Sequence, residues 1–220
     1  MRLRDWTKNI LFLVIYLFSG GALMLIIDGL STGTELTPFN TAIEAVMVQL
    51  RTPLLTNLMI FVTNIGSPYM LSALAIFLAI YLLLKGDTYD AILYLASIVL
   101  AIISFVVLKD TFQFTRPTDS LLDLTTWSFP SGHATVSTAF FFSTGYTFFG
   151  RFKNAFYRIG LVLLCILGAL TISFSRLYLG AHWALDVLAG LAIGLMAASL
   201  VLLVSNIFLE ERYWKMRAHR

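Results

Sequence analysis

Three short groups of polar residues stand out in this mostly apolar chain because their side chains could together bind an oxyanion. They are Lys109 with Arg116-Pro117, then Pro130-Ser131-Gly132-His133, and finally Ser175-Arg176 with His182 and Asp186. Two arginine forks and a lysine suit an anion that carries several oxygens. If a helix opens at the second group, its free backbone N–H groups would face the same anion, and glycine would let the backbone approach it closely. Nearby carboxylates could balance part of the positive charge: Asp110, Asp119, Asp123 and Asp186.

Two histidines could act on such an anion directly. His182 and Asp186 are four residues apart, so on a helix they share one face. The carboxylate could hold one imidazole N–H and leave the other ring nitrogen as a nucleophile with a free lone pair. Protonated His133 could give its proton to a leaving alkoxide. The neighbouring cations would stabilise charge on the oxygens of a phosphoryl group in transfer.

Each of these residues also has a simpler interpretation. Lys109 could be a lysine that reaches from a span end to the membrane surface, and His133 could be a helix cap. The sharper alternative is zinc, which His133, His182 and Asp186 could ligate. Three fixed cations would repel a metal ion, and the sequence offers no matching carboxylate set for magnesium. We therefore expect no metal and no cofactor.

The composition indicates a membrane protein. Of the 220 residues, 59% are hydrophobic and only 12% are charged, whereas roughly a quarter of the residues in a soluble domain are charged. Six apolar runs approach the length of a membrane-spanning helix: 9–27, 67–84, 91–108, 134–149, 158–174 and 183–209. We predict an all-α integral membrane protein, with residues 1–220 forming one domain built as a six-transmembrane-helix bundle.

The first apolar run has an alternative as a signal peptide. Arg2, Arg4 and Lys8 would form its basic start, and Ser19-Gly20-Gly21-Ala22 would offer small residues for cleavage. The apolar run resumes over residues 23–27, which gives it the length of a span. We therefore expect a retained helix.

The long connection between the first two spans predicts two further helices. Asn40 could cap one that runs to Arg51, and Pro53 opens a second apolar stretch that ends at Gly66-Ser67-Pro68. The apolar residues of the first are spaced along one face, as in an amphipathic helix. We expect both helices to lie on the outer membrane surface. The alternative is one long tilted helix over residues 54–84.

The distribution of charge predicts the orientation. Most of the 15 lysine and arginine residues precede the first span, follow the last one, or lie in the loops after the second and fourth spans. By the positive-inside rule both termini are cytoplasmic, and the three polar groups face the outside of the cytoplasmic membrane. The basic tail could also contact anionic lipid headgroups. The small net charge of +3 does not suggest a nucleic-acid partner, and the single cysteine, Cys165, excludes a disulfide within the chain.

The three groups resemble the signature motifs of a known family. Lys109 with Arg116-Pro117, Pro130-Ser131-Gly132-His133, and Ser175-Arg176 with His182 and Asp186 match, in order and spacing, those of the type 2 phosphatidic acid phosphatase superfamily. The motifs cover residues 109–186, and the pattern of spans extends the resemblance over nearly the whole chain.

The resemblance implies a metal-independent phosphatase that acts on a lipid phosphate or diphosphate in the bilayer through a phosphohistidine intermediate. His182 would be the nucleophile, Asp186 would orient it, and His133 would be the general acid. The phosphate would be bound by Lys109, Arg116, Ser131, Gly132 and Arg176. Among bacterial members, the chain is similar in size and layout to those that act on phosphatidylglycerophosphate or undecaprenyl diphosphate. Phosphatidic acid is a third possible substrate.

Other functions remain open on the sequence. Some phosphotransferases and the soluble vanadium haloperoxidases use the same motifs, but the predicted spans argue against the haloperoxidases. A transporter is disfavoured because no charged or broken helix is predicted at the middle of the membrane. A catalytically inactive scaffold is disfavoured by the complete motifs.

The electrostatic argument against a metal generates a first prediction. Treatment of the purified protein with EDTA should leave the rate of phosphate release from a lipid phosphate largely unchanged, because fixed cations take the place of a metal ion. The rate is measured before and after dialysis against the chelator. A loss of activity that added zinc restores would refute this expectation.

Overall fold

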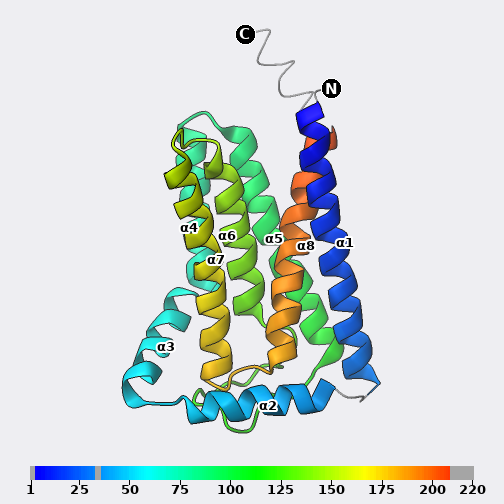
Figure 1. The fold of residues 1–220 in the computed structure, drawn as a ribbon, viewed down its shortest axis with the longest axis vertical. Coiled ribbons are helices and arrows are strands. Elements are labelled where there is room, and N and C mark those ends of the chain that lie inside the picture. The colour runs from blue at the N-terminus through cyan, green and yellow to red at the C-terminus, as the bar shows by residue number, and fades with distance from the viewer. Residues whose placement is uncertain (1–2, 33–35, 209–220) are drawn as a thin grey trace.

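The computed structural model describes residues 3–32 and 36–208, with side chains for 6–32 and 38–207. All regular structure in these ranges is helical, which confirms the all-α prediction (Figure 1). The helices are α1 (Leu3–Ser31), α2 (Leu36–Gln49), α3 (Pro53–Ile65), α4 (Pro68–Leu84), α5 (Thr88–Phe112), α6 (Gly132–Phe149), α7 (Ala155–Tyr178) and α8 (Ala184–Phe208). The basic tail 212–220 and the first basic residue, Arg2, lie outside the described residues.

Four of the six predicted spans are helices long and apolar enough to cross a membrane: α1, α5, α7 and α8. The helix α4 is apolar but has only 17 residues. The helix α6 carries serine and threonine residues along its length, which suits a helix enclosed by its neighbours better than one facing lipid. These findings support an integral membrane protein, while the count of six spans stays a prediction.

The helices α5 and α7 continue beyond the apolar runs that predicted them. Lys109 lies in the last turn of α5 and Arg176 in the last turn of α7, although the apolar runs end at residues 108 and 174. At the start of α6, Ser131 is the N-cap, so His133 lies in the first turn. Lys109, His133, Arg176 and Asp186 are thus attached to helix ends, which restricts their positions, whereas Arg116 and His182 lie in loops. Because α8 begins at Ala184, the prediction that His182 and Asp186 share one face of a helix is wrong.

The long connection forms two helices, α2 and α3, which are bent relative to each other by 120°. The predicted break is confirmed: α3 ends at Ile65, and Ser67 caps α4, which begins at Pro68. A single helix over residues 54–84 is therefore wrong. Figure 1 shows α2 crossing the end of the bundle. Whether α2 and α3 lie on a membrane surface stays a prediction.

The predicted role of Asn40 as a helix cap is wrong. The helix α2 begins earlier, at Leu36, and Asn40 is a buried residue within it. Its side-chain oxygen accepts a hydrogen bond from the backbone N–H of Leu185 at 3.1 Å. This bond satisfies one of the N–H groups that the first turn of a helix leaves without an intrahelical partner, so Asn40 joins α2 to the start of α8.

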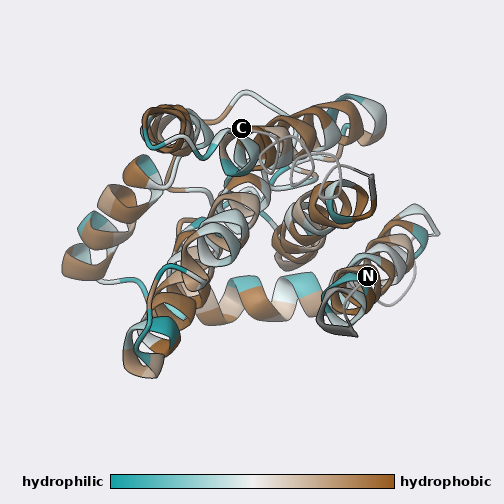
Figure 2. Cartoon of the chain, turned by 90° about the horizontal axis from the view of Figure 1, so that it is seen from above, coloured by the Kyte–Doolittle hydropathy of each residue, from teal (hydrophilic) through white to brown (hydrophobic). Residues whose placement is uncertain are grey.

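The bundle is built around α6, which packs against α4, α5, α7 and α8, while α1 packs along α8. Its interior contains many small polar side chains, including Thr135, Ser137 and Ser143 of α6. Large apolar side chains such as Phe18 and Met24 are exposed, and Figure 2 shows hydrophobic residues around the perimeter of the bundle. This distribution suits a molecule whose sides are solvated by lipid.

Two glycines allow α8 to approach α6 closely. A Cβ atom on Gly190 would lie 2.7 Å from the carbonyl oxygen of Ser131, and one on Gly194 would lie 2.5 Å from that of Thr135. The glycines are four residues apart and therefore share one face of α8, as in the small-residue contacts of membrane helices. The close approach brings the start of α6, with its polar group, beside the start of α8.

Replacement of Gly194 should therefore destabilise the bundle. Gly194→Leu places a side chain against the backbone of α6, and overpacking of this kind typically costs about 1–3 kcal/mol. Thermal unfolding in detergent should show a lower midpoint for this variant than for the native protein. The matched control is Gly21→Leu on α1, where a new Cβ meets no atom within 4 Å. Equal midpoints for the two variants would contradict the proposed packing.

Candidate active site

The structure brings the three polar groups together at one end of the bundle. Lys109 ends α5 and Arg176 ends α7, whereas His133 begins α6 and Asp186 begins α8. Because α5 and α7 run antiparallel to α6 and α8, these ends meet where α2 crosses the bundle (Figure 1). Arg116 reaches the same place from the loop between α5 and α6.

The carboxyl group of Asp186 is buried and connects the surrounding loops. Its Oδ2 accepts hydrogen bonds from the Ser128 hydroxyl and from the backbone N–H of Trp183, the latter at 2.9 Å. The backbone oxygen of Asp186 also accepts a hydrogen bond from the Ser131 N–H at 3.0 Å. Asp186 therefore holds the loop before α6 against the start of α8, and with it the position of both histidines.

His182 lies between the carboxylate of Asp186 and the guanidinium group of Arg116. Its Nδ1 is 3.5 Å from Oδ2 of Asp186, and its Nε2 is 3.3 Å from a terminal nitrogen of Arg116. The Nδ1 contact is an ion-pair distance rather than a hydrogen bond, and Nδ1 has no hydrogen-bond partner in the described residues. Nδ1 is thus directed to the carboxylate, and Nε2 is directed to the cations.

The surroundings of His182 favour its neutral form. Burial, followed by the positive charges of Arg176, Arg116 and Lys109, holds the pKa of His182 well below its ordinary value. A neutral imidazole keeps a lone pair on one ring nitrogen. The site can therefore present His182 as a nucleophile at neutral pH.

The guanidinium group of Arg116 is fixed by the loop that carries it. It donates to the backbone oxygens of Thr126, Trp127 and Ala181, and to the Thr126 hydroxyl at 2.9 Å. Burial lowers the pKa of Arg116, and the charge of Asp186 partly offsets this effect. The side chain stays a cation, since arginine has an ordinary pKa above 12.

Two further cations lie near the histidines. Lys109 donates to the backbone oxygen of Trp127 at 2.8 Å, so Lys109 and Arg116 share one acceptor. Arg176 is only 3% exposed, and it donates from a terminal nitrogen to the Thr63 hydroxyl at 2.7 Å. The Nε atom of Arg176 is buried without a partner in the described residues. Because an unpaired buried donor is costly, this atom is well suited to an anionic ligand.

The second polar group forms the start of α6. The Ser131 hydroxyl accepts a hydrogen bond from the backbone N–H of Ala134, so it caps the helix. A Cβ on Gly132 would lie 3.0 Å from the ring of Phe105, which gives this glycine a packing role that the sequence did not reveal. His133 is partly buried, and burial, followed by the positive charge of Arg176, lowers the pKa of His133 to about 2. The negative charge of a bound phosphate would raise this pKa again, which a role as proton donor requires.

Within the described residues, the additional acids suggested from the sequence form no ion pair with the cations of the site, although the charge of Asp110 acts on Lys109. Asp119 pairs with Arg51, with 2.7 Å between the charged atoms. No described ion pair joins Asp110 or Asp123 to a cation of the site. Within residues 6–32 and 38–207, no three His, Cys, Asp or Glu side chains group as metal ligands. Asp186 is therefore the acid that directly contacts a histidine of the site.

Three residues that position the site were missed from the sequence: Thr63, Thr126 and Ser128. Thr63 lies on α3, far from Arg176 in the chain, and only folding brings the two together. Thr126 and Ser128 belong to the polar loop between α5 and α6, in which hydroxyl residues are common and no single one stands out. For Ser128 the sequence offers one signal, since this residue comes just before the second polar group.

The helix α2 covers part of the site. Asn40, Ile43, Glu44 and Met47 of α2 line a small cavity, about 10 Å³ in volume, together with His182. A cavity of this size holds about one water molecule. A phosphate ester would therefore need α2 or its neighbouring loop to move before it reached His182 from this side.

The contacts of Asp186 generate a prediction for Ser128. Ser128→Ala removes one of the two hydrogen bonds to Oδ2, and a bond to a charged group contributes about 1.5–3 kcal/mol. If that energy holds Asp186 and His182 in place, turnover should fall roughly 10- to 100-fold. Phosphate release from a lipid phosphate measures the effect. Ser120→Ala, in the same loop but bonded only to Leu122, is the control, and equal rates would contradict the role.

Comparison with known proteins agrees with the motifs. The family model described as the PAP2 superfamily matches residues 90–209. The chain is 29% identical over 167 residues to phosphatidylglycerophosphatase B of Bacillus subtilis, covering 73% of this chain and 80% of the relative. It is also 29% identical over 197 residues to undecaprenyl-diphosphatase of Sulfolobus acidocaldarius, covering 86% of this chain and 85% of the relative.

Solved structures show the same fold. The transmembrane PAP2-type phosphatidylglycerolphosphate phosphatase of Bacillus subtilis superposes with a TM-score of 0.73 at 24% identity, covering 90% of this chain and 98% of that one. LpxE of Aquifex aeolicus superposes with a TM-score of 0.61 at 25% identity, covering 74% and 94%. The chain therefore belongs to the PAP2 superfamily and is an integral membrane phosphatase.

Proposed function

We propose that the protein is a metal-independent lipid phosphate or diphosphate phosphatase that forms a phosphohistidine on His182. The observation that carries this proposal is the position of His182 between two opposite charges. Asp186 lies 3.5 Å from its Nδ1, and Arg116 lies 3.3 Å from its Nε2. A neutral imidazole whose free nitrogen points toward a group of cations is suited to attack an electron-poor centre that carries negative oxygens.

In the first step, Nε2 of His182 attacks the phosphorus atom of the lipid phosphate. The P–N bond forms while the P–O bond to the lipid breaks, and the leaving oxygen takes a proton from His133. The attack places positive charge on the imidazole, and the nearby carboxylate of Asp186 stabilises it. Ser128 and the Trp183 N–H hold this carboxylate from the other side, so it does not need to reorganise during the reaction.

In the second step, water attacks the phosphohistidine. His133, now neutral, accepts a proton from the water as the new P–O bond forms and the P–N bond breaks. Inorganic phosphate leaves, and His182 returns to its neutral form. The same residue thus serves as acid and then as base, which restores the starting protonation state without a metal-bound water.

The phosphoryl oxygens would be bound by Lys109, Arg116 and Arg176. In the transition state negative charge is spread over these oxygens, and fixed cations stabilise it without reorganisation. Arg176 is held by Thr63, and its Nε–H remains available. The N–H groups at the start of α6, near Ser131 and Gly132, add a helix N-terminus directed at the same anion.

The relatives support a lipid substrate and leave its headgroup open. One is named for phosphatidylglycerophosphate and another for undecaprenyl diphosphate, which differ in both headgroup and chain. Their shared feature is a terminal phosphate on an apolar anchor. We therefore propose this class, with phosphatidic acid as a further member, rather than one lipid.

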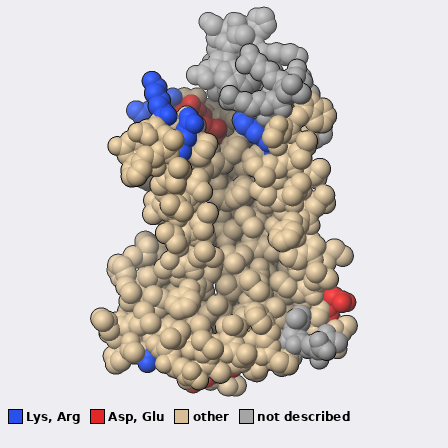
Figure 3. Space-filling view, viewed as in Figure 1, with Lys and Arg blue, Asp and Glu red and all other residues tan. Residues whose placement is uncertain are grey.

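We also propose that the active site faces outward from the cytoplasmic membrane and that both termini are cytoplasmic. Lys8, Lys85, Arg151, Lys153 and Arg158 lie at the end of the bundle opposite His182. Figure 3 shows basic side chains gathered at the end where α1 begins. The positive-inside rule assigns that end to the cytoplasm.

His182→Ala tests the mechanism. Loss of the nucleophile should abolish both phosphate release and the acid-labile phosphoenzyme that labelled substrate forms in rapid-quench experiments. His133→Ala should lose phosphoenzyme formation from alkyl phosphates but keep more of it from an aryl phosphate, whose leaving group needs no proton. Phosphoenzyme in the His182 variant would exclude the assigned nucleophile.

A substrate panel completes this test with the native protein. Phosphate release is measured with phosphatidylglycerophosphate, undecaprenyl diphosphate and phosphatidic acid, each at matched surface concentration in micelles. A hydrolase should release phosphate from at least one of them without an added alcohol. Product that forms only when an alcohol acceptor is present would indicate a phosphotransferase instead.

A further inference from the structure

A large groove lies at the end of the bundle opposite His182. Its volume is about 930 Å³, and α1, α6 and α7 form its walls together with Leu195 of α8. Figure 3 shows this face of the molecule hollowed between α1 and α7. The proposed mechanism uses no residue of this groove.

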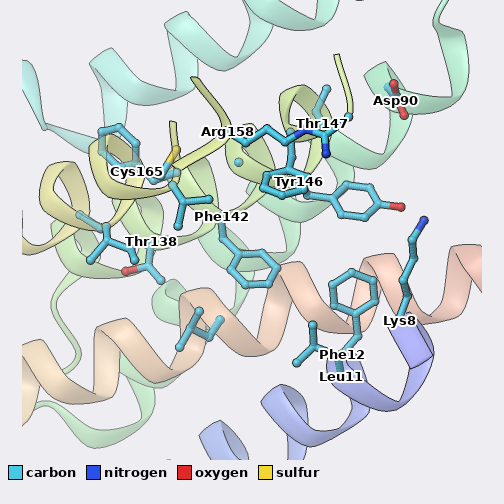
Figure 4. A pocket seen from close by; sticks show the side chains of 18 residues that line it. Lys8, Leu11, Phe12, Asp90, Thr138, Phe142, Tyr146, Thr147, Arg158 and Cys165 are labelled. Carbon is cyan, nitrogen blue, oxygen red and sulfur yellow. The ribbon is translucent and has the colours of Figure 1, made fainter. Parts of the chain in front are cut away.

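The groove is apolar along its length and charged at one end. Leu11, Phe12, Phe142, Val162 and Ile166 are among the side chains that line it. In Figure 4, Lys8, Asp90 and Arg158 lie toward one end, whereas Thr138 and Cys165 lie toward the other. A ligand that matched this pattern would have a charged head and an apolar tail.

The charge at this end is positive because three cations, Lys8, Arg151 and Arg158, outnumber the acids Asp87 and Asp90. Asp90 lies 2.7 Å from Arg151, which also binds Asp87 at 2.8 Å. Arg158 donates to a backbone oxygen, that of Phe152, and stacks on the ring of Phe149, contacts that leave its charge unbalanced. Neither Lys8 nor Arg158 forms an ion pair with any described carboxylate.

The depth of the groove matches one leaflet of a bilayer. Along α7 its lining extends from Arg158 to Ala169, which is roughly 16 Å at about 1.5 Å per residue. The hydrocarbon core of a bilayer is about 30 Å thick, so a single leaflet contributes about 15 Å. A lipid standing in its normal orientation would place its headgroup at the cations and its acyl chain along the apolar wall.

We propose that this groove binds one anionic glycerophospholipid from the leaflet opposite the active site. Lys8 and Arg158 bind the headgroup phosphate, and an acyl chain packs between α1 and α7. The lipid fills the gap between these two helices. The site is separate from the catalytic one, so this inference does not depend on the proposed mechanism.

The experiment counts bound lipid by native mass spectrometry of the full-length protein in detergent, titrated with phosphatidylglycerol. Each cation near an anionic headgroup strengthens binding by roughly fivefold. Lys8→Gln with Arg158→Gln should therefore weaken the first binding event by roughly 25-fold. The matched control is Lys85→Gln with Lys153→Gln, which removes two cations from the same end but none that lines the groove. Its affinity should equal that of the native protein.

A second variant tests whether the lipid binds in the groove, and it leaves the charge of the protein unchanged. Gly145→Leu fills the groove, because a Cβ on Gly145 would lie 3.7 Å from the sulfur of Cys165 without a clash. It should abolish the first binding event. In the native protein, phosphatidylglycerol should also slow alkylation of Cys165, the only cysteine in the chain. Activity on a water-soluble phosphate ester should be unchanged in all variants, which verifies their folding.

Three results would overturn the proposal. Equal weakening by the groove pair and the control pair would mean that phosphatidylglycerol responds only to overall charge. Equally tight binding of phosphatidylcholine would mean that the cations do not select an anion. Undiminished binding to a folded, active Gly145→Leu protein would place the lipid elsewhere.

Discussion

The geometry of the catalytic end depends on one buried carboxylate. Asp186 contacts His182 through its side chain, and it receives hydrogen bonds from Ser128, Trp183 and, on its backbone, Ser131. These residues come from two loops and from the starts of α6 and α8. A buried carboxylate is costly unless it is hydrogen-bonded, so this energy favours a single arrangement of the loops. The position of His182, the proposed nucleophile, follows from that arrangement.

The cations of the site destabilise the fold, whereas the hydrogen bonds of Asp186 stabilise it. Lys109, Arg116 and Arg176 lie close together, so their mutual repulsion opposes folding, and the loop between α5 and α6 offsets part of it. Backbone oxygens of Thr126 and Trp127 accept from Lys109 and Arg116. The protein thus holds three positive charges around a neutral histidine before any substrate arrives. Preorganised charge of this kind stabilises a transition state in which negative charge is spread over the phosphoryl oxygens.

Both ends of the molecule place cations beside a site for a phosphate, but in different surroundings. At one end, buried Arg176 and partly buried Lys109 and Arg116 surround His182, which α2 partly covers. At the other, exposed Lys8 and partly buried Arg158 border an open apolar groove. Both arrangements suit a phosphate joined to an apolar chain, but only the first contains the proposed nucleophile and proton donor. The difference separates a site for chemistry from the proposed site for a structural lipid.

The sequence by itself determined the family and the class of the fold. The motif residues and the all-α membrane class follow from local pattern and apolar length, which need no knowledge of distant contacts. Tertiary structure decided what holds those residues. Thr63 of α3 accepts a hydrogen bond from Arg176. Asn40 accepts a hydrogen bond from the backbone of α8 instead of capping α2. Asp119 pairs with Arg51 rather than with a cation of the site. Such partners meet only because the helices approach closely, as Gly190 and Gly194 permit between α8 and α6. Residues that are distant in the chain form no local sequence pattern, so the sequence alone does not reveal these contacts.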